Sequence, residues 1–123
     1  MTGDHLTADL TGCPGDRQLM TDAHCLRALC FEAVQAAGLT PVGELFHVFP
    51  PPGGVTGVVL LADSHLAVHT WPARGAVTLD AYVCNLSGDH SAAALRLVDR
   101  LIAAFAPRQV RRQRWLRGSD DIG

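Results

Sequence analysis

A serine, an aspartate and two histidines interrupt the most apolar part of the chain, in the segment LADSHLAVHTWP (61–72). Apolar runs of this length usually form buried strands, in which an unpaired polar group is costly. Taken singly, Ser64, His69 and the later Cys84 would each most often be packing residues with satisfied hydrogen bonds. Their occurrence together, next to Asp63, indicates instead a site of chemistry.

Metal binding and serine-hydrolase chemistry are two alternatives for these residues. His65 and His69 lie four residues apart, and on a strand this spacing separates two side chains by about 13 Å, too far to share one ion. No carboxylate or thiol lies at a helpful offset, so we expect no metal. Ser64 lacks the G-x-S-x-G turn that exposes a hydrolase nucleophile, so hydrolysis has little support.

The basic residues exclude one large class of enzymes. All ten of them are arginines, and the chain contains no lysine. No side-chain amine can therefore form a Schiff base with a substrate or with pyridoxal phosphate.

Composition indicates an ordinary globular domain spanning residues 1–123, with 48% hydrophobic residues and a net charge of −2. We expect neither a nucleic-acid nor a membrane partner, because the charge is slightly acidic and no apolar run approaches the roughly 20 residues that span a bilayer. The arginine-rich segment RQVRRQRWL (108–116), around Trp115, could be a nucleic-acid patch, but a solvated edge strand is the favoured interpretation.

The cysteines point to a cytoplasmic protein with free thiols, since there is no secretory signal and no CxxC pair. Three of them lie on or near the first strand and helix and are expected to be packing residues: Cys13, Cys25 and Cys30.

Hydrophobic periodicity predicts two helices. The first begins at the capping residues Thr21 or Asp22 and ends before Gly38, and the second begins at the cap Ser91 and ends before Pro107. The apolar face of the second helix is expected to comprise Leu95, Val98, Leu101, Ile102 and Phe105.

Strands are predicted at residues 5–13, 44–49, 55–63, 65–71, 76–84 and 108–116. The order β-α-β-β-β-β-α-β predicts an α+β two-layer sandwich, with two helices on one face of an antiparallel sheet. The other face would be mixed rather than polar, because Ala76, Tyr82 and Cys84 share it with Thr78 and Asp80. Pairing with a second copy would cover it, so we expect a homodimer.

The chain resembles the short, prokaryotic type of S-adenosylmethionine decarboxylase. The resemblance is carried by FHVF (46–49), GVTGVVLLADSHLAVHTWP (54–72) and LDAYVC (79–84), and it extends from HLTADLTGC (5–13) to the basic C-terminal strand. It implies the fold of that family and a self-processing, pyruvoyl-dependent amino-acid α-decarboxylase of polyamine biosynthesis, with neither pyridoxal phosphate nor a metal.

The resemblance also implies how the cofactor is made. Ser64 Oγ attacks the carbonyl of Asp63, His69 helps to remove the proton that eliminates the resulting ester, and Thr56 assists. The dehydroalanine left at position 64 hydrolyses to a pyruvoyl group, so that residues 1–63 and 64–123 become two chains.

In turnover, the resemblance implies that the pyruvoyl carbonyl forms a Schiff base with the substrate amine and accepts electrons as CO2 leaves. Cys84 matches the family's proton donor, a role that suits a thiol. Phe49 and Trp71 fall in segments that line the family's substrate pocket. On a straight strand, however, Ser64 and His69 would lie about 16 Å apart on opposite faces, so the mechanism requires a bend near Ser64.

Two positions depart from the family pattern. The family usually cleaves a Glu-Ser bond, where this chain has Asp63-Ser64, and it usually has HTWPE, where this chain has Ala73. That glutamate is implied to bind the ribose hydroxyls of S-adenosylmethionine, and losing such an acceptor typically costs about 1.5–3 kcal/mol.

The loss of the ribose ligand narrowly favours arginine or ornithine, which some family members decarboxylate, over S-adenosylmethionine. Such a substrate needs an acid for its distal cation, and the candidates are Asp9, Asp63, Asp80 and Glu44. S-adenosylmethionine itself remains the alternative substrate. An unprocessed, non-enzymatic relative is a third alternative, which the intact Ser64, His69 and Cys84 argue against.

Overall fold

The computed structural model describes residues 1–86 and 88–118. Its six strands and two longer helices follow the predicted order: β1 (Thr2–Thr11), α1 (Ala23–Ala36), β2 (Pro41–Val48), β3 (Val55–Leu61), β4 (His65–Trp71), β5 (Ala76–Cys84), α2 (Ser91–Phe105) and β6 (Gln109–Gly118). Two short 3-10 helices are also present, η1 (Gln18–Met20) and η2 (Pro72–Arg74).

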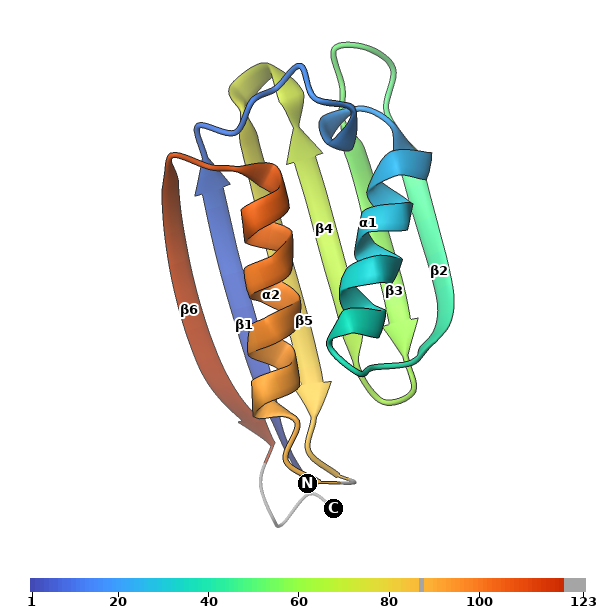
Figure 1. The fold of residues 1–123 in the computed structure, drawn as a ribbon, viewed down its shortest axis with the longest axis vertical. Helices are drawn as coiled ribbons and strands as arrows, with labels where there is room; N and C mark the ends of the chain where they lie inside the picture. Colours follow the sequence, from blue (N-terminus) through green and yellow to red (C-terminus); the bar gives the residue numbers. More distant parts are fainter. Residues whose placement is uncertain (87, 119–123) are drawn as a thin grey trace.

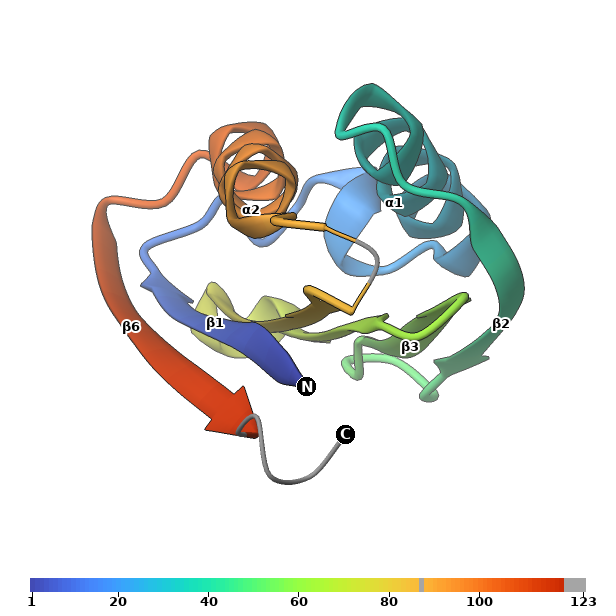
Figure 2. The same ribbon diagram turned by 90° about the horizontal axis from the view of Figure 1, so that it is seen from below.

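The strands form one antiparallel sheet in the order β2-β3-β4-β5-β1-β6. Strands β2 to β5 make the expected meander, and β1 lies between β5 and β6. Both helices pack on the same face of the sheet, and the other face is uncovered (Figures 1 and 2). The predicted two-layer α+β sandwich is therefore confirmed.

The two helices show one agreement with the prediction and two corrections, one at a helix end and one on a helix face. Asp22 caps α1 by accepting a hydrogen bond from the backbone N–H of His24 at 2.8 Å. In α2 the capping position is His90, and Ser91 is the first helical residue, which donates from its hydroxyl to Asp89 Oδ1 at 2.7 Å. Leu95 is 47% exposed, so its predicted place in the core was wrong. It lies one residue, about 100° around the helix, from the buried Ala94.

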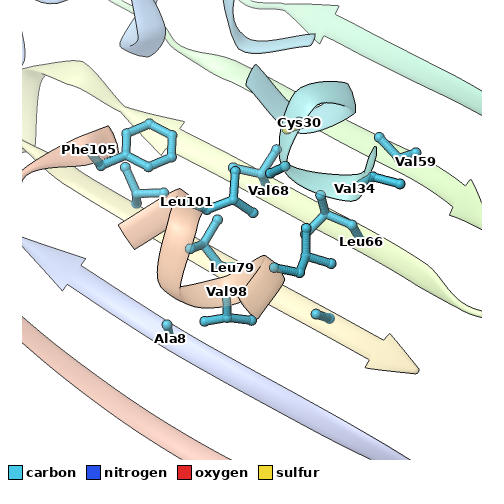
Figure 3. Packing of buried hydrophobic residues seen from close by; sticks show 14 of the residues in the cluster. Ala8, Cys30, Val34, Val59, Leu66, Val68, Leu79, Val98, Leu101 and Phe105 are labelled. Atoms are coloured by element: carbon cyan, nitrogen blue, oxygen red, sulfur yellow. The ribbon is translucent and has the colours of Figure 1, made fainter. Parts of the chain in front are cut away.

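The core fills the space between the helices and the sheet (Figure 3). Val68 of β4 and Leu79 of β5 lie near Leu101 of α2, whereas Leu66 of β4 lies near Val34 of α1, and all of these side chains are buried. Each such side chain contributes about 1.5–3 kcal/mol through its removal from water. Cys30 is buried in the same cluster, and desolvation raises the pKa of its thiol to about 12.

Alternation along the strands sorts the remaining side chains between the two faces. On β3, β4 and β5 the residues that face the helices are apolar apart from Thr70, whereas the uncovered face carries Thr56, His65, His69, Thr78, Asp80 and Tyr82. The polar residues singled out from the sequence thus lie mainly on the side without helices. Among the described residues, no helix is long and apolar enough to cross a membrane.

Candidate active site

Ser64 lies in the short turn, residues 62–64, that joins β3 to β4. The turn is closed by a hydrogen bond from the backbone N–H of Leu61 to the carbonyl of Ser64 at 2.9 Å. The Asp63–Ser64 bond therefore lies outside the strands, where the chain can be cut without breaking a strand.

The hydroxyl of Ser64 is held by two neighbours. Its oxygen accepts a hydrogen bond from the backbone N–H of Cys84 at 2.9 Å, and its proton is directed to Asp63 Oδ1 at 3.3 Å. The contact with β5 follows from strand register, because His65 pairs with Tyr82 and so brings the preceding turn to the end of β5. The candidate nucleophile and the candidate proton donor are thus adjacent, and the Cys84 thiol is free and buried.

A second group of candidate residues lies at the other end of β4. Thr56 and His69 are directly opposite each other on β3 and β4, and Thr56 Oγ1 is 3.1 Å from His69 Nδ1. The His69 ring stacks on Trp71 with a centroid distance of 5.8 Å. On the next strand, His47 meets Phe49 edge to face at 4.6 Å.

The two groups do not meet within one chain. The turn at residues 62–64 precedes β4, and β4 runs unbroken from His65 to Trp71, so the turn does not bring His69 to Ser64. Five residues of extended chain place them about 16 Å apart. No hydrogen bond joins Ser64 to His69 in the described part of the chain. The bend required by a mechanism within one chain is therefore not present.

A mainly apolar cavity of about 460 Å³ opens beyond the end of β4. It is lined by Gly15, Asp16, Thr21, Val48, Phe49, Pro51, Pro52, Gly53, Pro72 and Ala73. Phe49 and Ala73, which were singled out from the sequence, thus share one cavity.

Asp16 lines the same cavity as Ala73, and no motif in the sequence had indicated it. It belongs to the loop after β1, which packs on η2: the Cys13 N–H donates to the Gly75 carbonyl at 2.9 Å. A side chain at Gly15 would collide with the carbonyl of Pro72. The glycine in CPGD was the only local signal that this loop makes a close contact.

The four acids proposed for a basic substrate are dispersed. Asp63 contacts Ser64, and Asp80 and Asp9 lie on the uncovered face in different rows of the sheet. Glu44 instead forms an ion pair with Arg27 of α1 at 3.1 Å, on the helix-covered side. This ion pair separates Glu44 from the other three acids.

The arginines of β6 are partly engaged by the protein itself. Arg114 donates to the buried carboxylate of Asp4 at 2.6 and 2.8 Å, and Arg112 pairs with Asp99 of α2. These contacts agree with a structural edge strand. Among residues 1–86 and 88–118, no group of three or more metal-ligating side chains is found.

Comparison with known proteins bears on this arrangement. Residues 4–118 match the family model described as S-adenosylmethionine decarboxylase. The chain belongs to this family. Its members are pyruvoyl-dependent decarboxylases that are made as proenzymes and carry a covalent pyruvoyl group derived from a serine, and this chain is accordingly a pyruvoyl-dependent decarboxylase.

Individual relatives of this decarboxylase agree with the family match. The S-adenosylmethionine decarboxylase proenzyme of Aquifex aeolicus (strain VF5) is 40% identical over 116 residues, covering 94% of this chain and 81% of that protein. The proenzyme of Picrophilus torridus is 38% identical over 117 residues, covering 95% and 85%. The crystal structure of the Aquifex aeolicus adenosylmethionine decarboxylase superimposes with a TM-score of 0.84 at 38% identity, covering 95% of this chain and 91% of that one.

Proposed function

We propose that this decarboxylase cleaves its own Asp63–Ser64 bond and then decarboxylates S-adenosylmethionine for polyamine biosynthesis in the cytoplasm. The observation that carries the proposal is the Ser64 hydroxyl, held at 2.9 Å by the backbone N–H of Cys84 in the turn between β3 and β4. The names of the relatives support the substrate, and the free cysteines support the compartment.

Self-cleavage begins at Ser64. Asp63 Oδ1 accepts the hydroxyl hydrogen bond at 3.3 Å, which increases electron density on Oγ. Attack of Oγ on the Asp63 carbonyl carbon forms an ester as the peptide C–N bond breaks, and the serine nitrogen gains the proton. Removal of the Ser64 α-proton by His69 then expels the Asp63 carboxylate. The dehydroalanine left at residue 64 would take up water and release its nitrogen as ammonia, which gives the pyruvoyl group. The new chain 64–123 would then begin with this group in the turn beside Cys84.

We propose that a second copy of the chain supplies His69 and Thr56 to the Ser64 of the first. The uncovered sheet face includes exposed apolar side chains, among them Leu45, Leu60 and Trp115, whose burial would stabilise a dimer. A two-fold axis that runs across the strands lays the beginning of one β4 over the end of the other. Each site would then combine Ser64 and Cys84 of one copy with His69 and Thr56 of its partner.

In turnover the pyruvoyl group supplies the electron sink for loss of CO2. The chain's own residues bind the substrate and move the proton: the Cys84 thiol would protonate the α-carbon, and Phe49 and Trp71 offer aromatic surface to the nucleoside. The partner's cavity, with Phe49 in its wall, would hold the base.

Asp16 could replace the missing glutamate as a ligand for the ribose of S-adenosylmethionine. Its carboxylate lines the same cavity as Ala73 and offers an acceptor for the ribose hydroxyls from a different loop. Arginine and ornithine remain the second candidates because Asp16 could equally bind a distal cation, but the relatives named above are S-adenosylmethionine decarboxylase proenzymes. The family match and the retained Ser64 oppose the unprocessed, non-enzymatic alternative.

Electrophoresis of the purified protein under denaturing conditions tests processing. Wild type should give two fragments of nearly equal size, Ser64→Ala should stay whole, and the surface control Ser91→Ala should be cleaved like wild type. Persistent cleavage of Ser64→Ala would show that the serine is wrongly assigned. Release of CO2 from S-adenosylmethionine, arginine and ornithine, assayed side by side, then decides the substrate, and Asp16→Asn should raise the KM for the nucleoside substrate.

Co-expression of two inactive variants tests the shared site. Neither Ser64→Ala nor His69→Ala should be active alone, whereas each mixed dimer has one site with both residues intact. Random pairing should restore up to about a quarter of wild-type activity and cleave part of the His69→Ala chains. If the mixture stays inactive and uncleaved, each copy must use its own His69.

A further inference from the structure

His5, on the uncovered face of β1, carries a buried hydrogen-bond donor without an acceptor. Arg117 Nη1 lies 3.3 Å from His5 Nδ1. Because a guanidinium only donates, Nδ1 must accept and the imidazole proton must lie on Nε2. Nε2 is buried, and among the described residues it is the one buried side-chain nitrogen or oxygen without a partner. Native proteins rarely leave such a group unsatisfied, so a bound acceptor is expected here.

Further donors converge on the same place. A cavity of about 350 Å³ is lined by Met1, His5, His65, Tyr82, Arg117 and Gly118. The Tyr82 ring lies between the two imidazoles, at 6.2 Å from His5 and 5.8 Å from His65. Within residues 1–86 and 88–118, the acceptor of the Tyr82 hydroxyl is the thioether of Met1, at 3.6 Å, which is a weak acceptor that an oxygen would replace.

Strand register places residues that line this cavity close to the Asp63–Ser64 bond. His65 directly follows Ser64, and Tyr82 precedes the Cys84 that binds the Ser64 hydroxyl by two residues on the same strand. The Tyr82 ring covers Gly3, because a Cβ there would lie 2.5 Å from the Tyr82 hydroxyl. Gly3 in turn is paired with Cys84. The donors therefore lie beside the residue that would become the cofactor.

We propose that this cavity binds the α-carboxylate of the amino-acid substrate, through His5 Nε2–H, the Tyr82 hydroxyl and the Arg117 guanidinium. The inference rests on the proposed function, in which the substrate amine must reach residue 64. The carboxylate is attached to the same α-carbon as that amine, so it has to lie in the immediate surroundings of residue 64. No carboxylate in the described chain forms an ion pair with Arg117.

These donors also suit a substrate carboxylate that must leave as CO2, because they do not bind it too tightly. The one cationic donor of the set that is fixed by chemistry, Arg117, is exposed to solvent, so the carboxylate is bound weakly enough to leave as CO2. Removing a donor should therefore weaken substrate binding and raise KM, without a matching fall in kcat.

Calorimetric binding to the purified, self-cleaved protein tests the subsite. Two ligands are compared: a substrate analogue without the α-amine, which keeps the carboxylate and cannot react, and the decarboxylated product, which has no carboxylate. His5→Phe and Arg117→Gln should each weaken the analogue about tenfold, as expected for a charge-assisted hydrogen bond, and leave the product within about twofold. His5→Gln, which retains a donor near the Nε2 position, should recover part of the loss.

Arg111→Gln is the matched control, because Arg111 shares the strand and the face of Arg117 but lines a different cavity with Asp9. Equal weakening of both ligands, or of neither, overturns the proposal. So does a His5→Phe protein that dissociates into monomers at unchanged affinity for the analogue, since the donor would then serve the partner copy. If His5→Phe fails to fold, Arg117→Gln alone decides.

Gels and CO2 release from the same samples distinguish a failure of the carboxylate subsite from a failure of the proposed function. If wild type is cleaved and active but the variants do not weaken the analogue selectively, only the subsite is overturned. An uncleaved, inactive wild type overturns the proposed function instead.

Discussion

The two faces of the sheet are built from the same strands, but one face forms the core and the other carries candidate site residues. The helix-covered face holds the apolar core, and its buried polar exceptions in the described chain are Asp4 and Thr70. The uncovered face holds the paired Thr56 and His69 and the stacked His65 and Tyr82. Successive residues of a strand alternate between the two faces. A residue that stabilises the core can therefore be followed directly by one that takes part in chemistry.

His69→Ala should have the largest effect, and it should be on chemistry alone. Loss of a positioned proton acceptor typically slows a reaction about 10²- to 10⁴-fold, so self-cleavage and CO2 release should fall by that range. Thermal unfolding should stay close to wild type, because His69 faces away from the core. A large fall in Tm would mean that the uncovered face also stabilises the fold.

Leu66→Ala should show the reverse pattern on the opposite face of β4. Leu66 is 1% exposed beneath the helices, so truncation should cost about 2–5 kcal/mol of unfolding free energy in urea titrations. Leu60→Ala, on the uncovered face and 49% exposed, is the matched control and should cost less than about 1 kcal/mol in the monomer. Equal losses would remove the distinction between the faces.

Thr70→Val tests the main polar exception on β4. The Thr70 hydroxyl accepts from the Val55 N–H and donates to the Met20 carbonyl, both at 2.8 Å. Valine keeps the shape but leaves two buried groups unpaired, so the free energy of unfolding should fall by about 1–3 kcal/mol. The same change at Thr78 should be nearly neutral. If Thr70→Val is equally harmless, these hydrogen bonds do not anchor η1 to the sheet.

The smallest effect is expected at Cys30, because a thiol buried on the helix-covered face should not react. Burial raises the pKa of its thiol to about 12, so in native protein at pH 8 iodoacetamide should modify the partly exposed Cys25 and spare Cys30. The raised pKa stabilises the folded state fully below the pH at which an unfolded thiol ionises. That contribution is lost as the pH rises towards 12. Mass spectrometry of peptides would follow the labelling, and modification of Cys30 as early as Cys25 would contradict this assignment.

Most of the fold was predictable because it depends on local periodicity. Alternation in AVTLDAYVC (76–84) separates the two faces, and Asp22 and Gly38 mark the ends of α1 as expected. Leu95 was misplaced because a run of apolar residues in α2 leaves the centre of the buried face ambiguous by one position.

The site was less predictable because its contacts depend on register and on distant loops. The hydrogen bond of Ser64 with Cys84 requires the pairing of β4 with β5, which turn geometry and packing determine together. Asp16 lines the same cavity as Ala73 because the loop after β1 folds back on η2. The separation of His69 from Ser64 follows from a straight β4, which lacks the bend near Ser64 that was expected from the sequence.

The position of β1 between β5 and β6 gives the proposed cut an additional consequence. After cleavage, a strand of the first fragment would remain interleaved between two strands of the second, so the fragments could not separate without dismantling the sheet. Folding would have to precede cutting, and afterwards refolding would require two separate molecules to meet. The uncut chain should therefore recover from urea at any dilution, whereas the mature enzyme should recover only when concentrated.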